Sequence, residues 1–351
     1  MKIKSGRMKL IKNPNSKKHF VEIKGDDLFN VLIETGDKVL HDEHIHETPI
    51  RDNLFNYETR QRDWSRIFNE PMYLNKPDSG VATSGCSIPI IFEDENLIVV
   101  DKPCGIPVHP TQSYFYNSIT EILRQETMNL SLRTIPSDSE LNQGQFLPCH
   151  RIDKLTSGVL MIGKNNETVS NIKKLMKSKS LRKEYIARVK GKFPLTFDQC
   201  QDNIVYMYAM KNIIKEFKNP MTYFKRISYD PVLNESIVHC KPITGFPHQI
   251  RIHLRNLGYP ITNDPLYSEG KIYDKVIKNR DEINDNFIQD YVIKANLNRD
   301  KLDTNLKCEI CLKSIYFDPE PSDIELYLHS LSYQDENNWK FETPLPLWSH
   351  I

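Results

Sequence analysis

The chain has 351 residues, of which 39% are hydrophobic and 26% are charged, and its formal net charge is +1. These values are typical of a globular protein with one large or two smaller domains, and they exclude a uniformly basic nucleic-acid binder. No apolar run approaches the ~18 residues of a membrane span, and the sequence indicates neither a membrane association nor an obligate protein partner. Seven cysteines without regular spacing and a polar start after Met1 predict a cytoplasmic location, with the mitochondrion and the nucleus as alternatives.

The N-terminal part divides into two predicted segments. Residues 1–50 contain "RMKLI", "HFVEIKG" and "ETGDKVLHDEHIHE", which indicate a small β-rich unit. Residues 51–85 are polar and dotted with Pro, Asn and Asp, which predicts a linker or an insertion. The main domain is predicted to span residues 86–351, with a charged, Asn-rich insertion at residues 268–306.

The first half of the main domain begins with a predicted hairpin. Two apolar strands flank residues 93–96, and a third apolar run follows at residues 159–162. Apolar residues then recur at helical spacing from Val169 to Met176, and Asn165 or Asn166 is available to cap this helix. The stretch "KEYIARVKGKF" alternates as a strand does, with Tyr185, Ala187 and Val189 on one face.

The second half continues with a strand at residues 236–243. The stretch "TGFPHQIRIHLRNLG" predicts a turn and a short helix, with Pro247 near its start and Gly258 just past its end. The segment "SDIELYLHSLSYQ" returns to strand. Hairpins mixed irregularly with helices predict an α+β fold, with a mixed, largely antiparallel sheet and flanking helices.

Several chemistries lack their motifs. The sequence has no phosphate-binding G-x-x-x-x-G-K-[ST] loop and no G-x-G-x-x-G fingerprint, so ATP hydrolysis and dinucleotide binding are not expected. Cys308 and Cys311 form one C-x-x-C pair without the second pair that a structural zinc site needs. His41, His44 and His46 cluster near two glutamates, but their pattern is weak. We expect no metal and no cofactor.

The stretch "HRIDKLTSG" at residues 150–158 crowds three ionisable side chains before a predicted strand. Taken singly, Asp153 is explained as a turn residue that accepts backbone N–H bonds. Tyr185 is likewise explained as a core residue, and Arg251 as a solvated helix residue. Sequence context changes this interpretation.

The context is a family resemblance. "HRIDKLTSG" resembles the H-R-L-D-x-x-T-S-G motif of the RluA-type pseudouridine synthases, and three further stretches resemble motifs of that family in the same order. These are "IIFEDENLIVVDKPCGIPVHPT", "RKEYIARVKGKFP" and "ITGFPHQIRIHLRNLGYPITNDPLY", so that the resemblance covers about residues 88–267.

The two ends of the chain narrow the resemblance. "CEICLKSIYFDPEPSDIELYLHSLSYQ" and "GDKVLHDEHIHETPI" are similar to segments of the eukaryotic, tRNA-modifying branch of the family. In that branch the second segment follows an alpha-L RNA-binding module, and "IKSGRMKLI" resembles only the second half of such a module. Residues 1–50 are therefore expected to form a truncated alpha-L-like unit.

The resemblance implies a cofactor-free isomerisation of uridine to pseudouridine in RNA, with tRNA as the partner. Asp153 would act on the sugar as a nucleophile or as a base, and Arg251 would keep its carboxylate ionised and orient both of its oxygens. Tyr185 would stack on the detached uracil and relay a proton. Arg151 would fill the space of the flipped-out nucleotide. The remaining substrate-binding candidates are His150, which could also support the loop, and Thr156, His248 and Gln249.

The target implied by the resemblance is a uridine of the anticodon stem-loop, at position 31 or 32. A basic segment from Lys164 to Lys192 holds ten Lys and Arg residues and is a candidate to bind phosphates, or else a solvated helix face. Phe246 and Pro247 replace Arg and Thr of the family motif, and Gln112 and Ser113 stand where Gly and Arg are common. These departures indicate altered substrate contacts or a degenerate enzyme. The alternative function is therefore a non-catalytic RNA-binding or RNA-folding protein of the same descent.

Overall fold

The structure is a computed structural model, and it describes only part of the chain. Described are residues 88–111, 114, 116–124, 146–195, 198–208, 213–270, 321–336 and 338–351, with six short strand segments and a few single residues elsewhere. The chain divides into two compact units, one formed by Met1–His46 and Asp303–Ile315, the other by Glu47–Leu302 and Tyr316–Ile351.

The short segments form three separate two-stranded sheets. β1 (Met8–Ile11) pairs antiparallel with β2 (Lys38–His41), inside the stretch that the sequence predicts to be β-rich. The other sheets pair β3 (Phe55–Asn56) with β4 (Gln61–Arg62) and β15 (Leu302–Lys307) with β16 (Ser314–Tyr316). Most of the predicted linker and insertion, together with Gln112, Ser113, His44, His46, Cys308 and Cys311, lies outside the described residues.

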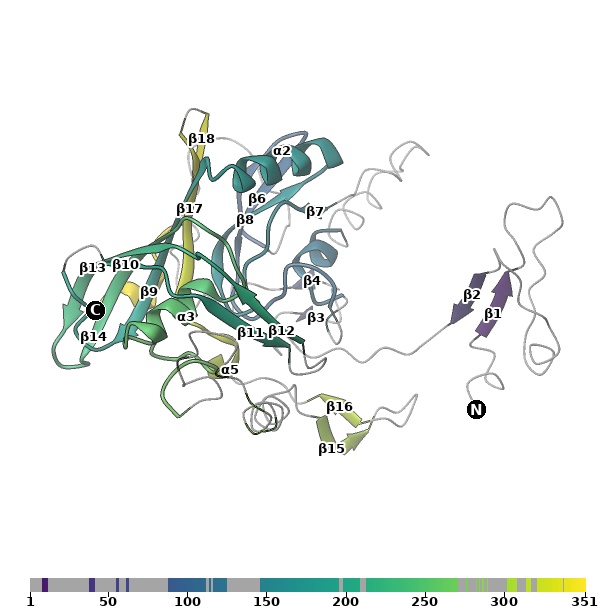
Figure 1. Ribbon diagram of the computed structural model, residues 1–351. Coiled ribbons are helices and arrows are strands. Elements are labelled where there is room, and N and C mark those ends of the chain that lie inside the picture. The colour runs from purple at the N-terminus through teal and green to yellow at the C-terminus, as the bar shows by residue number, and fades with distance from the viewer. Residues whose placement is uncertain are drawn as a thin grey trace. The chain divides into compact units, whose positions relative to one another are not determined.

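The larger unit is built on one mixed sheet (Figure 1). Its main path runs in the order β10-β13-β14-β9-β17-β8-β6-β5, while β18 pairs with β17 and β7 pairs with β8. The strands are β5 (Ile90–Glu93), β6 (Leu97–Lys102), β7 (Leu147–Pro148), β8 (Ser157–Gly163), β9 (Leu181–Lys190), β10 (Asp198–Cys200), β13 (Thr222–Asp230), β14 (Glu235–Pro242), β17 (Leu328–Asp335) and β18 (Trp339–Glu342). Of the pairings given for these strands, β17–β8 is parallel and the others are antiparallel. The predicted α+β fold with a mixed, largely antiparallel sheet is confirmed.

Strand β17 joins the two halves of this sheet. It pairs with β9 along one edge, and at its start it pairs with β8 through Ser330 and Gly158. Gly158 has a φ of 104°, and a Cβ atom there would lie 2.2 Å from the carbonyl oxygen of Ser330. Only glycine fits this position, because both the backbone angle and the close strand exclude a side chain. The turn that carries Asp153 is thereby held against β17.

Several local predictions are confirmed. In the β5–β6 hairpin, Asp94 Oδ1 accepts the N–H groups of Asn96 and Leu97, both at 2.7 Å. Helix α2 (Asn166–Lys177) is capped by Asn165, whose side chain accepts the N–H of Thr168. An asparagine at this position satisfies one of the N–H groups that the first turn of a helix leaves without a partner.

The remaining elements close the larger unit. Helix α3 (Gln249–Asn256) packs Ile250 and Leu254 into the same core as Tyr185, Ala187 and Val189, the predicted inner face of β9. β11 (Ile204–Tyr208) and β12 (Ile213–Phe217) form a hairpin. Where the sequence predicted strand from residue 322, helix α5 (Pro321–Ile324) comes first, because proline is favourable in the first turn of a helix. A 3-10 turn, η7 (Leu347–Ser349), follows β18.

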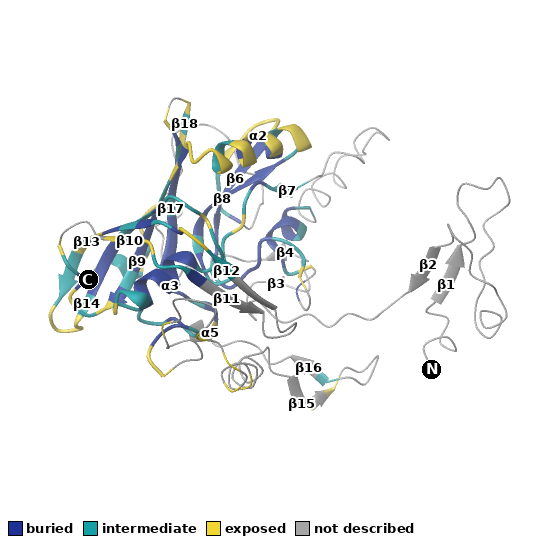
Figure 2. Cartoon of the chain, viewed as in Figure 1, coloured by how far each residue is buried: buried dark blue, intermediate teal, exposed yellow. Residues whose placement is uncertain are grey.

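Helix α2 carries much of the basic segment. The helix packs Val169 and Ile172 into the core and turns its outer side to solvent (Figure 2). The exposed basic residues of the segment are Lys173, Lys174, Lys177, Lys179, Arg182, Lys190 and Lys192. Among the described residues, no helix is both long and apolar enough to cross a membrane.

Candidate active site

Asp153 lies in the short loop between β7 and β8. The N–H of Thr156 donates to the carbonyl oxygen of Asp153 at 3.1 Å, which closes a turn. The buried amine of Lys102 donates to the carbonyl oxygens of Lys154, Pro103 and Ile106 at 2.7–2.9 Å, and so ties this turn to the end of β6. The Asp153 side chain stays 27% exposed. A rigid backbone thus presents a carboxylate that a ligand can reach.

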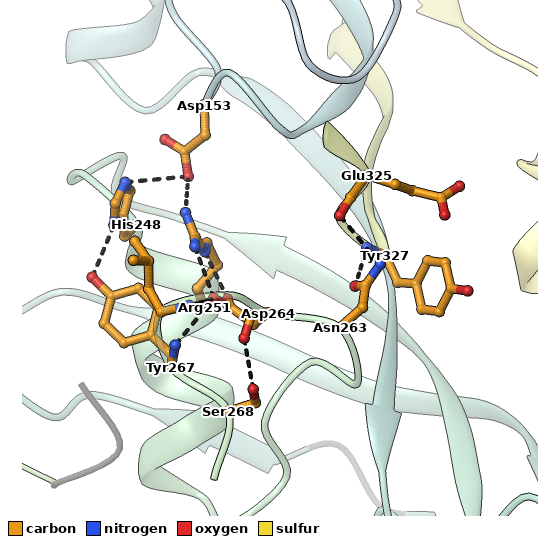
Figure 3. Close-up of polar contacts among 10 residues, drawn as sticks. Asp153, His248, Arg251, Asn263, Asp264, Tyr267, Ser268, Glu325 and Tyr327 are labelled. Atoms are coloured by element: carbon orange, nitrogen blue, oxygen red, sulfur yellow. Dashed lines mark hydrogen bonds and ion pairs between the residues drawn. The ribbon is translucent and has the colours of Figure 1, made fainter. Parts of the chain in front are cut away.

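The partner of Asp153 is Arg251, in the first turn of α3 (Figure 3). Its Nη1 donates to Asp153 Oδ2 at 3.2 Å. Its Nε and Nη2 donate to the two oxygens of Asp264 at 2.7 and 2.8 Å, and these two side chains are 2% and 0% exposed. The bidentate fork therefore grips Asp264, whereas the sequence led us to expect it on Asp153. One guanidinium serves two carboxylates, and the buried one fixes its position.

Asp264 is itself held by its own loop. Its Oδ1 accepts the N–H groups of Leu266 and Tyr267 at 2.8 and 3.1 Å. Burial raises the pKa of Asp264, but the Arg251 charge and these bonds outweigh burial and lower it. The neighbouring Asn263 accepts the N–H of Tyr327 at 2.8 Å, which anchors this loop beside β17 (Figure 3).

The charge state of Asp153 follows from its neighbours. Burial raises the pKa of Asp153, whereas His248, when it is protonated, and Arg251 lower it, and the net shift is downward. Burial also lowers the pKa of His248 to about 4, so that this imidazole is neutral near pH 7. Arg251 is therefore the charge that keeps Asp153 ionised under neutral conditions.

His248 occupies the residue before α3 with a φ of 54°. This left-handed conformation is uncommon for a residue with a side chain, although histidine adopts it more readily than most. Its Nδ1 lies 2.8 Å from the hydroxyl of Tyr267, and its Nε2 lies 3.7 Å from Asp153 Oδ2. The predicted substrate-binding residue thus lies beside the carboxylate.

Tyr185 comes from β9, the strand that pairs with β17. Its ring is buried, and its hydroxyl lies 2.7 Å from the hydroxyl of Tyr333 on β17. Burial raises the pKa of Tyr185, hydrogen bonds from Tyr333 and Ser330 act against this, and the negative charge of Asp153 raises the pKa further. The phenol is therefore neutral at physiological pH and close enough to Asp153 to sense its charge.

The other predicted substrate-binding residues lie in different environments. Arg151 is exposed, while Thr156 is 2% exposed and contributes to the turn through its N–H. The Nε2 atom of His150 accepts the N–H of Met161 at 3.1 Å, so this residue supports the loop.

Gln249 has a structural role. It is buried, and its amide oxygen accepts from the Thr244 hydroxyl and the Phe246 N–H at 2.7 and 3.1 Å. Its amide nitrogen donates to Met221 O and Thr222 Oγ1 at 3.0 and 2.9 Å. Because these bonds use both ends of the amide within the protein, they do not support the predicted contact of Gln249 with a substrate.

Phe246, one of the departures from the family motif, packs within the protein. Its ring stacks on that of Phe217 at 4.7 Å between centroids and 18° between planes. Both rings lie against the small core of Ile204, Ile252 and Tyr267. The phenylalanine at this position therefore packs the turn before α3 against β12.

The sequence around this site is similar to that of known proteins. Residues 96–256 match the family model described as RNA pseudouridylate synthase. The chain is 35% identical over 300 residues to the tRNA pseudouridine(31) synthase of Saccharomyces cerevisiae, covering 75% of this chain and 70% of that protein. The chain belongs to the RNA pseudouridylate synthase family. The family predicted from the motifs is confirmed.

Other members of the RNA pseudouridylate synthase family are also similar. The mitochondrial tRNA pseudouridine(32) synthase of Saccharomyces cerevisiae is 32% identical over 348 residues, covering 91% of this chain and 64% of that protein. The human pseudouridylate synthase RPUSD2 is 38% identical over 184 residues, covering 52% of this chain and 31% of that protein. The chain thus spans less than two thirds of the length of some of these family members.

Sequence reasoning missed two residues of this candidate site. Asp264 lies within "NDPLY", in a stretch already matched to a family motif, and its position 13 residues after Arg251 was the available signal. Tyr333 follows Tyr185 by 148 residues, and no local pattern links them. Within the described segments, no cluster of three or more His, Cys, Asp or Glu side chains is arranged to hold a metal ion.

Proposed function

We propose that this chain is an enzyme that isomerises uridine to pseudouridine in RNA, with tRNA as its substrate. The observation that carries the proposal is the partly exposed Asp153 carboxylate, held by an arginine that a second, buried carboxylate fixes in place. Family membership supports it, and so do the names of the similar yeast proteins, which are tRNA pseudouridine synthases.

The reaction needs an anion at the sugar. The bond from the sugar to the base nitrogen breaks, the detached uracil turns, and a new bond forms between the sugar and a ring carbon. Asp153 acts on the sugar, either by attacking it or by removing one of its protons, and both roles require the ionised carboxylate that Arg251 maintains. The proposal assigns no step to a cofactor.

Three further residues are assigned to contacts with the extruded nucleotide and its base. We assign the ring of Tyr185 to stacking on the uracil and its hydroxyl to the transfer of a proton. Arg151 is exposed two residues before Asp153, and we assign it to the space that the extruded nucleotide leaves. Extrusion costs a few kcal/mol, which such a replacement contact offsets. His248, beside Asp153, completes the substrate contacts that we propose.

The proposed target is a uridine of the anticodon stem-loop, at position 31 or 32, the positions in the names of the two yeast relatives. A loop base is less costly to extrude than one inside a duplex. The exposed lysines of α2 supply phosphate contacts, so we expect a salt-sensitive affinity.

A tritium-release assay tests the enzymatic activity. Total tRNA carrying tritium on carbon 5 of uridine loses the label when that carbon joins the sugar, so we expect release with the wild-type protein. Absence of release, together with measurable binding of the same tRNA, would favour the non-catalytic RNA-binding protein and refute the enzyme.

The target position needs a separate experiment. Unmodified tRNA transcripts are incubated with the protein, and pseudouridine is mapped by carbodiimide treatment and stalled reverse transcription. We expect stops at position 31 or 32. Stops confined to ribosomal RNA or to the tRNA elbow would refute the target and leave the enzyme class intact.

The cytoplasmic location is also a proposal. One relative is named as mitochondrial, which makes the mitochondrion the alternative. Cell fractionation with an antibody against the chain separates the two compartments.

A further inference from the structure

The protonation of His150 is fixed by a backbone contact. The N–H of Met161 donates to its Nε2 at 3.1 Å, so this nitrogen presents a lone pair. Burial, with a smaller contribution from the charge of Lys183, lowers the pKa of His150 to about 3. A neutral ring whose Nε2 accepts carries its hydrogen on Nδ1.

That hydrogen points along a chain of hydroxyl groups. His150 Nδ1 lies 3.4 Å from the hydroxyl oxygen of Tyr333, and the two rings lie 4.5 Å apart between centroids at 31°. The Tyr333 hydroxyl lies 2.7 Å from that of Tyr185. The nearby Ser330 hydroxyl donates to the carbonyl oxygen of Val159 at 3.3 Å. Because His150 can only donate on this side, the Tyr333 hydroxyl accepts a hydrogen bond from it and donates one to the Tyr185 oxygen.

We propose that Tyr333 is a positioning residue for the isomerisation, which donates a hydrogen bond to the Tyr185 oxygen and so stabilises this oxygen after it has given up its own hydrogen and before it takes the hydrogen that leaves carbon 5 of uracil. His150 sets the direction of this chain. The inference rests on the proposed function and extends it to β17, the strand that joins both halves of the sheet.

The reaction removes one hydrogen from carbon 5 of uracil and adds one to the ring nitrogen. When the new carbon–carbon bond has formed, the bond from carbon 5 to hydrogen breaks and its electron pair returns to the ring. Tyr185 first gives its own hydrogen to the substrate side, and the hydrogen bond from Tyr333 stabilises the resulting phenolate, which then takes the hydrogen from carbon 5. The ring nitrogen freed from the sugar must gain one hydrogen and receives it, directly or through water. Nothing leaves through Tyr333, because the Nδ1 atom of His150 already carries a hydrogen and has no lone pair to accept one.

The first test measures the rate of isomerisation by the Tyr333→Phe variant and its deuterium isotope effect. Transcripts with deuterium on carbon 5 of uridine are compared with ordinary transcripts in single turnovers. We expect the variant to be slower by about 10- to 100-fold, the value of one hydrogen bond to a developing charge. We also expect an isotope effect larger than that of the wild type, with unchanged RNA affinity. Tyr229→Phe is the matched control, because this tyrosine lies near the end of β13 and its hydroxyl donates to the exposed side chain of Asn234.

Two outcomes would overturn the proposal. One is a wild-type rate in Tyr333→Phe, and the other is a slower rate without a larger isotope effect, which a purely structural role would give.

A second measurement does not depend on activity. Nitrogen-15 NMR of histidine-labelled protein reports the tautomer of His150, identified by its loss in His150→Gln. A hydrogen on Nδ1 supports the chain, and a hydrogen on Nε2 reverses its direction and refutes the proposal. If the wild-type protein makes no pseudouridine, the proposed function fails, while the tautomer still tests the hydrogen-bond chain itself.

Discussion

The two sides of the candidate site handle burial in opposite ways. On the side of α3, Asp153, Arg251 and Asp264 are held as charges by one another. On the side of β9 and β17, burial keeps Tyr185 and Tyr333 neutral, and their hydroxyl groups share a hydrogen bond. We call these the charged side and the neutral side.

The difference follows from the partners that each side offers. Burial disfavours a charge unless an opposite charge and hydrogen bonds compensate it. Asp264 has both and keeps a lowered pKa, whereas burial raises the pKa of Tyr185. In the proposed reaction, the charged side supplies the anion that acts on the sugar, and the neutral side supplies the hydroxyl groups that transfer hydrogen to and from the base.

The largest effect is expected from Asp153→Asn, which removes the anion and keeps the shape. Isomerisation should fall by about 10⁴-fold or more. RNA affinity should stay within a few-fold, because phosphate contacts supply most of it. Tritium release and filter binding measure the two quantities. Turnover that persists in the purified variant would mean that the charged side does not perform the chemistry.

On the neutral side, Tyr185→Phe keeps the ring and removes the hydroxyl. We expect turnover to fall by about 10²- to 10⁴-fold, the usual contribution of proton transfer. A cleaved or rearranged intermediate should accumulate while binding persists, which gel and mass analysis of quenched single turnovers will detect. Product formation at the wild-type rate would show that the ring alone suffices.

Asp264→Asn tests whether the charged side also stabilises the fold. Removal of one charge from a buried pair should cost about 3–5 kcal/mol in the free energy of unfolding, measured by urea titration. Glu93→Gln is the matched control, because its ion pair with Lys164 at 2.6 Å is 40% and 27% exposed and should contribute less than about 1 kcal/mol. Equal losses in the two variants would contradict a special role of Asp264.

The smallest effect is expected from a change on the surface of α2, away from the candidate site. Neutralising Lys173 and Lys174 on the outer side of α2 should weaken tRNA binding a few-fold. It should also lower the dependence of affinity on salt, by about one unit of slope for each phosphate that the variant no longer binds. Lys225→Gln, an exposed change on β13, is the control. An unchanged salt dependence would make the basic segment a solvated helix face.

Local pattern predicted much of the fold. The β5–β6 hairpin, the Asn165 cap and the inner face of β9 depend on neighbours in sequence, and sequence periodicity reports these directly. The place of β17 between β8 and β9 was not predictable, because it depends on pairings across more than 140 residues.

The site was predicted by residue type and only partly by geometry. The motifs named Asp153, Tyr185 and Arg251, and the hydrogen bond from Arg251 to Asp153 agrees with the pairing expected of them. Sequence could not show that the arginine fork grips Asp264, because several carboxylates were available and only the fold decides which one is adjacent. For the same reason Gln249, named as a substrate contact, has its hydrogen bonds within the protein.

The central claim is that Arg251 keeps Asp153 ionised despite burial. Carbon-13 NMR of aspartate labelled at the side-chain carboxyl measures this directly, with Asp153→Asn identifying the signal. A lowered pKa means that protonation occurs only below the ordinary value of ~3.9, so the signal should keep its ionised position from pH 8 down to about 5. A titration of this signal with a midpoint above about 5 would show that burial prevails over Arg251, and would contradict the account.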